Sequence, residues 1–319
     1  MRDYKLLFSR SNKQAPPLTF LAGDASLRRY YRFWEEGQPY VLMDAPAPEN
    51  PQRFCELADF LCSLGLSAPR VFQQDLDQGY LVLEDLGDQT FTRCLDAGHD
   101  PEPLYNLAID VLIELHSCVK EPPLALADFT PEDLVAEVAL FFDWYWPEEY
   151  GHALDVNKKE EILGLWNEVF TKALASPKGL VLRDFHVDNL IWLEKRAGLQ
   201  QCGLLDFQDA VWGPKVYDII SLFEDARRDL PTSLVTGLWQ RYCAAFPEDN
   251  ADALLTAATV LSAGRHLKII GIFTRLHVRD GKLHYLAHIP RVWRLLHQCL
   301  EHPALVQIKQ WFHEHLPTY

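Results

Sequence analysis

One polar loop and the apolar runs around it constrain this chain more than any other feature. Three runs are each typical of a short strand: residues 179–182, 190–192 and 202–205. Asp184 follows the first run, Asn189 directly precedes the second, and Asp206 directly follows the third. With an expected turn at residues 195–198, the last two runs form a small hairpin. The sequence therefore predicts that the three polar side chains gather at one end of this hairpin.

These three side chains supply the groups that phosphoryl transfer requires. A carboxylate beside the acceptor hydroxyl acts as its base or orients it, and Asp184 suits this role. The Mg²⁺ that bridges the phosphates of ATP prefers oxygen ligands, which Asn189 and Asp206 are expected to provide, with Asp206 as the main ligand. The spacing thus predicts a phosphoryl-transfer site that uses ATP and Mg²⁺.

The same loop resembles the catalytic loop of the aminoglycoside phosphotransferase and choline kinase group. Asp184, His186 and Asn189 fall on the Asp, second His and Asn of its pattern His-Gly-Asp-x-His-x-x-Asn, whereas Leu182 departs from its first His. Three further stretches look like those of bacterial kinases that phosphorylate N-acetylmuramate and N-acetylglucosamine at the anomeric position: Gly23 to Arg32, Val41 to Pro46 and Leu205 to Ala210.

This resemblance covers most of the chain and implies its fold, cofactors and acceptor. It implies an α+β, protein-kinase-like bilobal fold, with a small β-rich N-lobe and a larger, mostly helical C-lobe. It also implies ATP and Mg²⁺ as cofactors and an amino sugar as acceptor, in cell-wall recycling.

The pattern of strands and helices divides the chain near residue 87. Residues 1–87 are expected to form the N-lobe, an antiparallel sheet with one helix over residues 52–64, and residues 88–319 the C-lobe with the catalytic hairpin. The predicted strands of the N-lobe are residues 18–21, 28–34, 40–44, 71–74 and 80–84. The predicted helices of the C-lobe are residues 104–116, 131–146, 158–175, 217–227, 252–275 and 292–300.

Composition narrows the class of protein. With 319 residues and 48% hydrophobic content the chain can bury the cores of two lobes. The net charge of -15 argues against a nucleic-acid partner, because clustered Lys and Arg bind phosphate backbones. No apolar run approaches the ~18 residues of a membrane span, and no signal peptide is expected. Seven cysteines without a Cys-x-x-Cys pair favour reduced thiols in the cytoplasm. The oligomeric state stays open.

The resemblance also implies a nucleotide site in the N-lobe. Backbone groups from Glu84, Asp85 and Leu86 are expected to pair with the adenine edge, as the hinge between lobes. Ser26 lies in a loop where kinases cover the phosphates, and it is expected to bind phosphate oxygens although the loop lacks the repeated glycines of Gly-x-Gly-x-x-Gly.

Met43 departs from the kinase pattern, because it occupies the place of the strand Lys that reaches the phosphates. A cation of the neighbouring strand, Arg28, Arg29 or Arg32, must replace that Lys. Strand alternation places Arg28 and Arg32 on one face and Arg29 on the other, and the sequence does not show which face meets the nucleotide. Glu56, on the first helix, is either an ion-pair partner of the cation or a solvated side chain.

Several other residues are candidates for roles in the site, and most of them have two possible roles. His186 either contacts phosphate or acceptor, or braces the loop by hydrogen bonds. Asp209 either binds metal or caps a turn. Asp218 is expected to brace the catalytic loop. Arg265 or Lys268 is a candidate for pairing with an acceptor carboxylate such as that of N-acetylmuramate, whereas an aminoglycoside would favour an acidic pocket.

Three classes of function remain open from the sequence. The first is the small-molecule kinase, whose acceptor is an amino sugar or, alternatively, an aminoglycoside or choline-type hydroxyl. The second is a catalytically silent nucleotide-binding protein, suggested by Met43. The third is a metallohydrolase that uses Asp184, His186, Asp206 and neighbouring aspartates with water as nucleophile. The third would explain neither the hinge nor the strands of the N-lobe.

Overall fold

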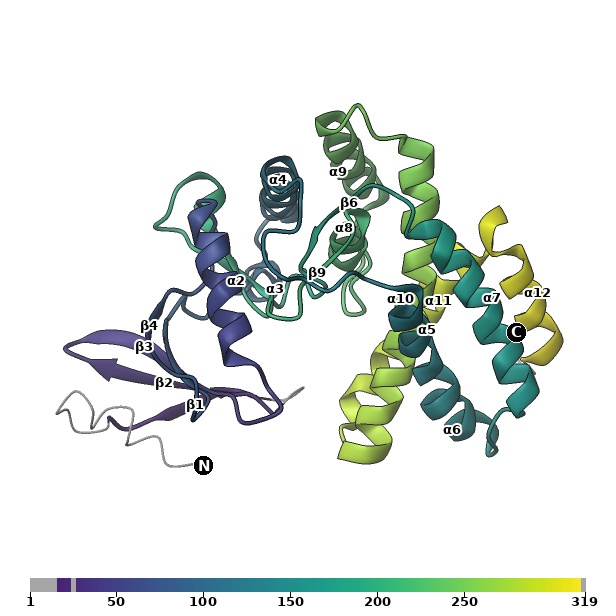
Figure 1. Cartoon of the computed structure of the whole chain (residues 1–319), viewed down its shortest axis with the longest axis horizontal. Coiled ribbons are helices and arrows are strands. Elements are labelled where there is room, and N and C mark those ends of the chain that lie inside the picture. Colours follow the sequence, from purple (N-terminus) through teal and green to yellow (C-terminus); the bar gives the residue numbers. More distant parts are fainter. Residues whose placement is uncertain (1–15, 24–26, 317–319) are drawn as a thin grey trace. The chain divides into compact units, whose positions relative to one another are not determined.

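The computed structural model describes residues 16–23 and 27–316 (Figure 1). The phosphate-loop candidate Ser26 lies outside them. The chain packs as two units, Met1–Val111 with Val187–Asp209 and Leu112–His186 with Ala210–Tyr319. The lobe boundary at residue 87 stays a prediction. The hairpin with Asn189 and Asp206 packs with the strands of the first unit.

The first unit is built on a five-stranded antiparallel sheet in the order β1-β2-β3-β5-β4. Its strands are β1 (Thr19–Ala22), β2 (Arg29–Glu35), β3 (Gln38–Asp44), β4 (Val71–Asp75) and β5 (Tyr80–Glu84), and each was predicted to within a few residues. Glu36 and Gly37, both with positive φ, form the tight turn between β2 and β3. Four buried side chains pack into a cluster on the sheet: Phe33, Leu42, Tyr80 and Val82.

One helix, α2 (Pro51–Ser63), lies beside this sheet (Figure 1). The Asn50 side chain accepts a hydrogen bond from the Arg53 N–H, which caps the helix N-terminus, and Gly65 follows its end with a φ of +79°. Apolar residues at helical spacing are buried: Phe54, Leu57, Ala58 and Leu61. The predicted helix over residues 52–64 is confirmed.

The predicted hairpin is confirmed as well. Its strands β7 (Leu190–Trp192) and β8 (Cys202–Leu204) pair antiparallel, with the 3-10 helix η2 (Gly198–Gln201) before β8. Leu190 lies opposite Leu204, which brings the residue before β7 and the residues after β8 to the same end. The first unit also contains α3 (Phe91–Asp96), which the sequence analysis missed.

The second unit is mostly helical and is organised around one long helix, α10 (Ala251–Asp280), which begins after an Asn250 cap. α10 packs against α5, α7, α8 and α11. A two-stranded sheet of β6 (Lys178–Val181) and β9 (Val211–Pro214) precedes α8. The helices are α4 (Pro101–Cys118, which begins in the first unit), α5 (Pro131–Leu140), α6 (Trp146–Tyr150), α7 (Val156–Ala173), α8 (Val216–Phe223), α9 (Thr232–Ala245), α11 (Ile289–Leu300) and α12 (Val306–His315), with 3-10 helices η3 (Leu283–His288) and η4 (Pro303–Leu305).

Two predicted helices differ from the structure. Residues 131–146 do not form one α-helix, because a π-helix, η1 (Phe141–Tyr145), follows α5. There α10 comes so close that a Cβ added at Gly271 would lie 2.4 Å from the carbonyl carbon of Leu140. The helix expected over residues 217–227 ends at Phe223, because Glu224 leaves helical geometry and is held by side chains of α10.

The sequence analysis also missed α9 and α12, whose apolar positions alternate with many polar ones. No helix in the described parts of the chain combines the length and apolar character needed to cross a membrane.

Candidate active site

In the second unit, the chain leaves β6 and turns sharply into the loop that carries Asp184. Arg183 adopts a φ of 72°, a left-handed conformation that few non-glycine residues take. The carboxylate of Asp218 accepts hydrogen bonds from the backbone N–H groups of Leu182 (2.7 Å) and Arg183 (2.8 Å) and so holds this turn. The predicted bracing role of Asp218 is confirmed. Burial raises the pKa of Asp218 to about 7 although the two N–H groups oppose that change.

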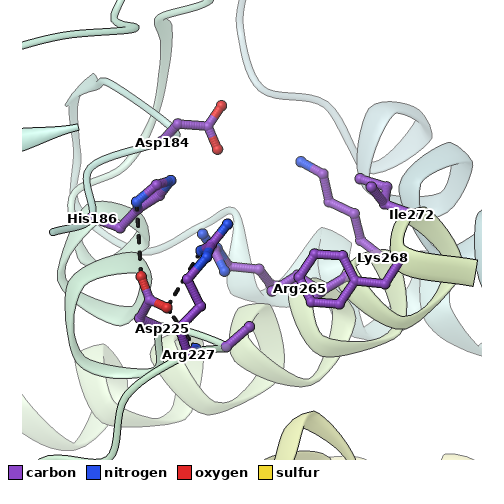
Figure 2. A pocket seen from close by; sticks show the side chains of 10 residues that line it. Asp184, His186, Asp225, Arg227, Arg265, Lys268 and Ile272 are labelled. Atoms are coloured by element: carbon purple, nitrogen blue, oxygen red, sulfur yellow. Dashed lines mark hydrogen bonds and ion pairs between the residues drawn. The ribbon is translucent and has the colours of Figure 1, made fainter. Parts of the chain in front are cut away.

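Asp184 lines a pocket formed entirely by residues of the second unit (Figure 2). Figure 2 shows Arg265 and Lys268 reaching from α10 toward the side of the pocket that carries Asp184 and His186. Ile272 and Phe273 add an apolar wall. Its polar lining residues are Asp184, His186, Asp225, Arg227, Arg265 and Lys268.

The charge state of Asp184 follows from this lining. Burial alone would raise the pKa of its carboxyl, but nearby positive charge, that of Lys268 above all, outweighs burial and holds the pKa below its ordinary value. Asp184 is therefore an ionised carboxylate in a partly dry pocket.

One carboxylate behind the pocket joins the pocket cation Lys268 to Arg183, the residue before Asp184. Glu137 of α5 accepts through Oε1 from Lys268 Nζ (2.7 Å) and from the guanidinium of Arg183. The Arg183 guanidinium also lies over the ring of Phe129, 5.4 Å from its centre. The sequence analysis missed Glu137, which lies 46 residues before Arg183.

The loop after α8 supplies the other acidic group of the pocket. Asp225 Oδ2 lies 3.8 Å from His186 Nδ1, and Asp225 Oδ1 accepts from the backbone N–H of Arg227 at 2.7 Å. Burial is the main reason that the pKa of His186 lies below its ordinary value, so the ring is neutral at pH 7. The 3.8 Å between His186 Nδ1 and Asp225 Oδ2 exceeds hydrogen-bond distance, so the loop-bracing role and the acceptor-contact role of His186 both stay predictions.

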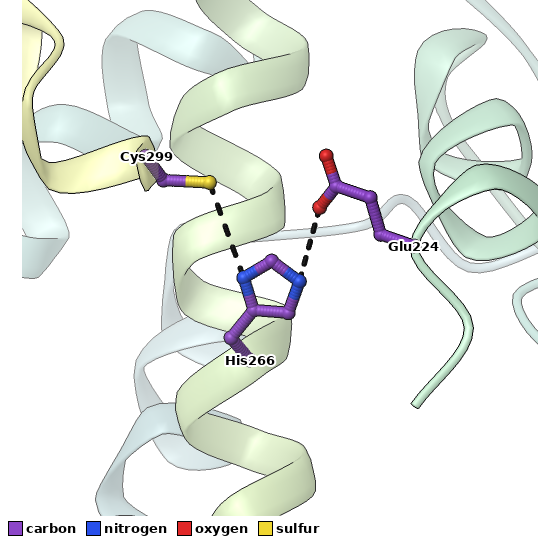
Figure 3. A group of neighbouring side chains, drawn as sticks. All are labelled: Glu224, His266 and Cys299. Atoms are coloured by element: carbon purple, nitrogen blue, oxygen red, sulfur yellow. Dashed lines mark hydrogen bonds and ion pairs between the residues drawn. The ribbon is translucent and has the colours of Figure 1, made fainter. Parts of the chain in front are cut away.

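Glu224, His266 and Cys299 lie together behind this loop (Figure 3). Figure 3 shows the His266 ring between the other two side chains, with Nε2 3.0 Å from Glu224 Oε2 and Nδ1 3.9 Å from Cys299 Sγ. The two ring nitrogens of His266 face different partners, Nε2 toward Glu224 and Nδ1 toward Cys299. We therefore interpret the group as a hydrogen-bond relay that anchors Glu224, which also accepts from Ser262 Oγ at 2.7 Å.

In the first unit, Asn189 and Asp206 lie at the same end of the hairpin. The Leu205 N–H donates to the Asn189 carbonyl oxygen at 2.9 Å, directly before Asp206. Gln208 Nε2 donates to Asp206 Oδ1 (2.8 Å) and to Asp209 Oδ2 (2.9 Å), so both carboxylates face one side. Asp206 has a φ of 57°, a strained conformation that is frequent at functional sites.

The structure shows which arginine in or directly before β2 meets these acidic groups. Arg28 Nη2 lies 3.5 Å from both Asp206 Oδ1 and Asp209 Oδ2, and Arg28 Nε lies 3.5 Å from Glu49 Oε2. The Arg29 guanidinium instead donates to the carbonyl oxygen of Gly23. The face with Arg28 is thus the face that meets the catalytic hairpin.

Arg32, on the same face, is held by two other carboxylates. It pairs with Asp85 at 2.5 Å and with Asp88 at 2.7 Å. Glu56, offered as the ion-pair partner of the cation, instead contacts Gln52 and Arg53 on its own helix, because α2 turns it away from the strand.

The hinge residues lie at the end of β5. The Glu84 N–H donates to the Arg70 carbonyl oxygen at 2.8 Å, and the Glu84 carboxylate pairs with Arg196 at 2.6 Å. Asp85 accepts from the Gly87 N–H. Leu86 follows in the same segment and packs near Gly203 of β8, so the hinge lies beside the hairpin. Pairing of this segment with adenine remains a prediction.

Asp188, on the loop between His186 and Asn189, accepts a hydrogen bond from the hydroxyl of Thr92 on α3. This hydrogen bond connects the loop to α3.

Comparison with known proteins agrees with this architecture. An N-acetylmuramate/N-acetylglucosamine kinase of Caulobacter vibrioides is 35% identical, over 93% of this chain and 92% of its own length. A protein of the same name from Pseudomonas putida is 36% identical, over 92% of this chain and 87% of its own. The crystal structure of the ADP-bound aminoglycoside phosphotransferase APH(2'')-Ib matches with a TM-score of 0.60 at 16% identity, over 94% of this chain and 99% of that one.

The structural match confirms the predicted α+β, protein-kinase-like fold class. Residues 17–254 match the phosphotransferase enzyme family. The match extends over most of the chain and includes the hairpin, the Asp184 loop and the start of α10, so this protein belongs to the phosphotransferase enzyme family.

Proposed function

We propose that this protein is a cytoplasmic, ATP- and Mg²⁺-dependent kinase that phosphorylates N-acetylmuramate or N-acetylglucosamine at the anomeric hydroxyl, in cell-wall recycling. The observation that carries the proposal is the pocket around Asp184. The Asp184 carboxylate is ionised, and the polar and charged side chains that line the pocket are suited to bind a small hydroxylated acceptor. Membership in the phosphotransferase family and the names of the two relatives support it.

Asp184 takes the role of base in this proposal. The bond between the γ-phosphorus and the bridging oxygen of ATP breaks, a bond forms between that phosphorus and the anomeric oxygen, and the hydroxyl proton passes to Asp184. ADP leaves. Because an anomeric hydroxyl is more acidic than other sugar hydroxyls, a carboxylate of ordinary or low pKa is a sufficient base.

Asn189 and Asp206 fit a magnesium ion. They present an amide oxygen and a carboxylate at one end of the hairpin, the donor types that Mg²⁺ prefers, and Asp209 is a further oxygen donor at the same side. Bound Mg²⁺ would supply positive charge that neutralises the phosphates of ATP.

We assign the role of the absent strand Lys to Arg28. Arg28 lies on the face that meets Asp206 and is oriented by Glu49, whereas Arg32 is already held by Asp85 and Asp88. A cation at this position supports an active kinase rather than a silent nucleotide-binding protein, although Met43 lies buried where the Lys would stand.

The charges of the pocket favour an amino sugar over an aminoglycoside as acceptor. An aminoglycoside carries several positive charges and requires an excess of carboxylates. Here three cations, Arg227, Arg265 and Lys268, line the pocket beside two carboxylates, Asp184 and Asp225.

Product analysis tests the proposal. The protein with Mg²⁺-ATP is expected to form ADP with N-acetylmuramate or N-acetylglucosamine, and the product should show coupling between phosphorus and the anomeric proton by NMR, as a 1-phosphate does. Asp184→Asn protein is the control. If neither sugar stimulates ADP formation while choline, homoserine or an aminoglycoside does, the acceptor is wrong and the kinase class stands. If no acceptor does and Mg²⁺-ATP does not bind, the kinase proposal itself is wrong.

A further inference from the structure

The pocket around Asp184 is positive in a protein of net charge -15. Three cations line it against two carboxylates, and the histidine among them is neutral. A local excess of positive charge in an acidic protein indicates a ligand group that is itself negative.

Two of the three cations already contact a carboxylate. Lys268 Nζ donates to Glu137 at 2.7 Å, and its charge also acts on Asp184 more strongly than that of any other cation. Arg227 Nη1 lies 3.4 Å from Asp225 Oδ1. The positive charges of Lys268 and Arg227 are therefore already paired with carboxylates of the protein itself.

Arg265 differs from them. Its Nη2 donates to the neutral hydroxyl of Ser221 at 2.7 Å. Among the described residues, no carboxylate oxygen lies within 4.0 Å of its guanidinium. Asp184, Glu224 and Asp225 feel its charge only from farther away. Arg265 is thus the pocket cation whose guanidinium contacts no carboxylate of residues 16–23 and 27–316 within 4.0 Å.

The surroundings of Arg265 hold it in place. His266, one residue after it on α10, contacts Glu224 (Figure 3). Ser262, three residues before it on α10, donates a hydrogen bond to Glu224. Ser221 fixes the guanidinium from α8. A guanidinium held in this way binds a carboxylate through two parallel hydrogen bonds with little loss of side-chain freedom.

We propose that Arg265 binds a carboxylate of the acceptor, and that this contact sets the preference for N-acetylmuramate over N-acetylglucosamine. The two sugars differ by the lactyl ether of N-acetylmuramate, which carries a carboxylate. This inference rests on the proposed function. It also decides between the two candidates from the sequence: Lys268 stays with Glu137 and Asp184, and Arg265 meets the acceptor.

The ratio of kcat/KM for the two sugars is the test. Arg265→Gln should lower the ratio of N-acetylmuramate to N-acetylglucosamine by about 10- to 100-fold, as expected for loss of a charge-assisted hydrogen-bond pair. Arg265→Lys should retain part of the preference. Arg279→Gln, on the same helix but paired with its exposed neighbour Asp280, is the matched control and should leave the ratio unchanged.

A measurement on the unmodified protein needs no variant to fold. N-acetylmuramate should be a better substrate than its neutral methyl ester by about the same 10- to 100-fold factor, because the ester keeps the shape and loses the charge. In Arg265→Gln protein the acid and the ester should become equivalent.

Four outcomes would overturn the inference. Equal losses for both sugars in Arg265→Gln would show that Arg265 only shapes the pocket. Equal turnover of acid and ester by the unmodified protein would show that the carboxylate is not recognised. If the protein phosphorylates N-acetylglucosamine but not N-acetylmuramate, the proposed carboxylate contact is wrong and the proposed amino-sugar kinase function stands. If it phosphorylates neither sugar, both proposals are wrong.

Discussion

The charged groups at the hairpin end of the first unit are held less tightly than the ion pair behind the pocket of the second unit. In the first unit, Arg28 contacts its three carboxylates at 3.5 Å, and the side chains of Asp206 and Asp209 are 43% and 57% exposed. In the second unit, Glu137 and Lys268 are 14% and 18% exposed and lie 2.7 Å apart.

The hairpin end and the pocket therefore suit different kinds of ligand. Long contacts from Arg28 to the exposed carboxylates of Asp206 and Asp209 are weak and are easily exchanged for contacts with phosphate and metal. Short contacts between half-buried groups fix a pocket in advance, because each lost contact would leave a charge without compensation. The hairpin end is thus suited to an exchangeable, highly charged ligand, and the pocket to a small acceptor that must be oriented.

The largest expected effect is on turnover. It separates the role of Asp184 in the second unit from that of Asp206 in the first unit. Asp184→Asn should fold normally and bind Mg²⁺-ADP, but its turnover should fall roughly 10²- to 10⁴-fold, because a positioned base is lost. Asp206→Ala should instead lose the Mg²⁺-dependent part of nucleotide affinity, measured by calorimetry with and without EDTA. Near-normal turnover in Asp184→Asn would show that the base has been assigned wrongly.

The next effect tests the difference in rigidity directly. Glu137→Gln should lower the free energy of unfolding by about 2–3 kcal/mol, because Lys268 and Arg183 lose their shared carboxylate in a half-buried place. Asp209→Asn, the matched change in the hairpin, should alter that free energy by less than about 0.5 kcal/mol.

Urea denaturation of both variants and of the unmodified protein gives this comparison. Equal losses of unfolding free energy in the two variants would show that the charged groups of the pocket are held no more tightly than those at the hairpin end.

The smallest expected effect is a change of the free energy of unfolding with pH. Burial raises the pKa of Asp218 to about 7 from an ordinary value of 3.8, so the folded protein retains this proton where the unfolded chain has lost it. The stabilisation from the raised pKa is present at low pH and is lost as pH rises through 7. Between about pH 6 and pH 8 the unmodified protein should lose about 1 kcal/mol of unfolding free energy relative to Asp218→Asn. A pH-independent difference between the two proteins would show that Asp218 is ionised throughout this range.

Much of the hairpin and its polar groups could be predicted from the sequence, because local rules govern them. Alternation of apolar and polar residues predicted every strand of the five-stranded sheet, and the positions of Asn189 and Asp206 at strand ends placed them together. In each case the information lies within a few residues along the chain.

Prediction failed where distant packing decides the outcome. Residues 141–145 have the composition of an α-helix, but the close approach of Gly271 accompanies a π-helix there. Residues 224–227 extend a helical pattern, but contacts of Glu224 with Ser262 and His266 of α10 accompany its end at Phe223. Neither partner is marked by any local pattern.

Local periodicity and spacing predicted every strand except β9, most of the helices, the hairpin, and the residue types needed for phosphoryl transfer, because this information lies in residues that are close together in the chain. Only the tertiary structure decided that Arg28 rather than Arg29 meets the acidic hairpin, that Glu49 rather than Glu56 pairs with it, and that Arg265 alone among the pocket cations lacks a carboxylate within 4.0 Å in the described part of the chain. The reason is physical. Which charges pair depends on through-space distance and burial, and these are set by segments that pack together from far apart in the chain.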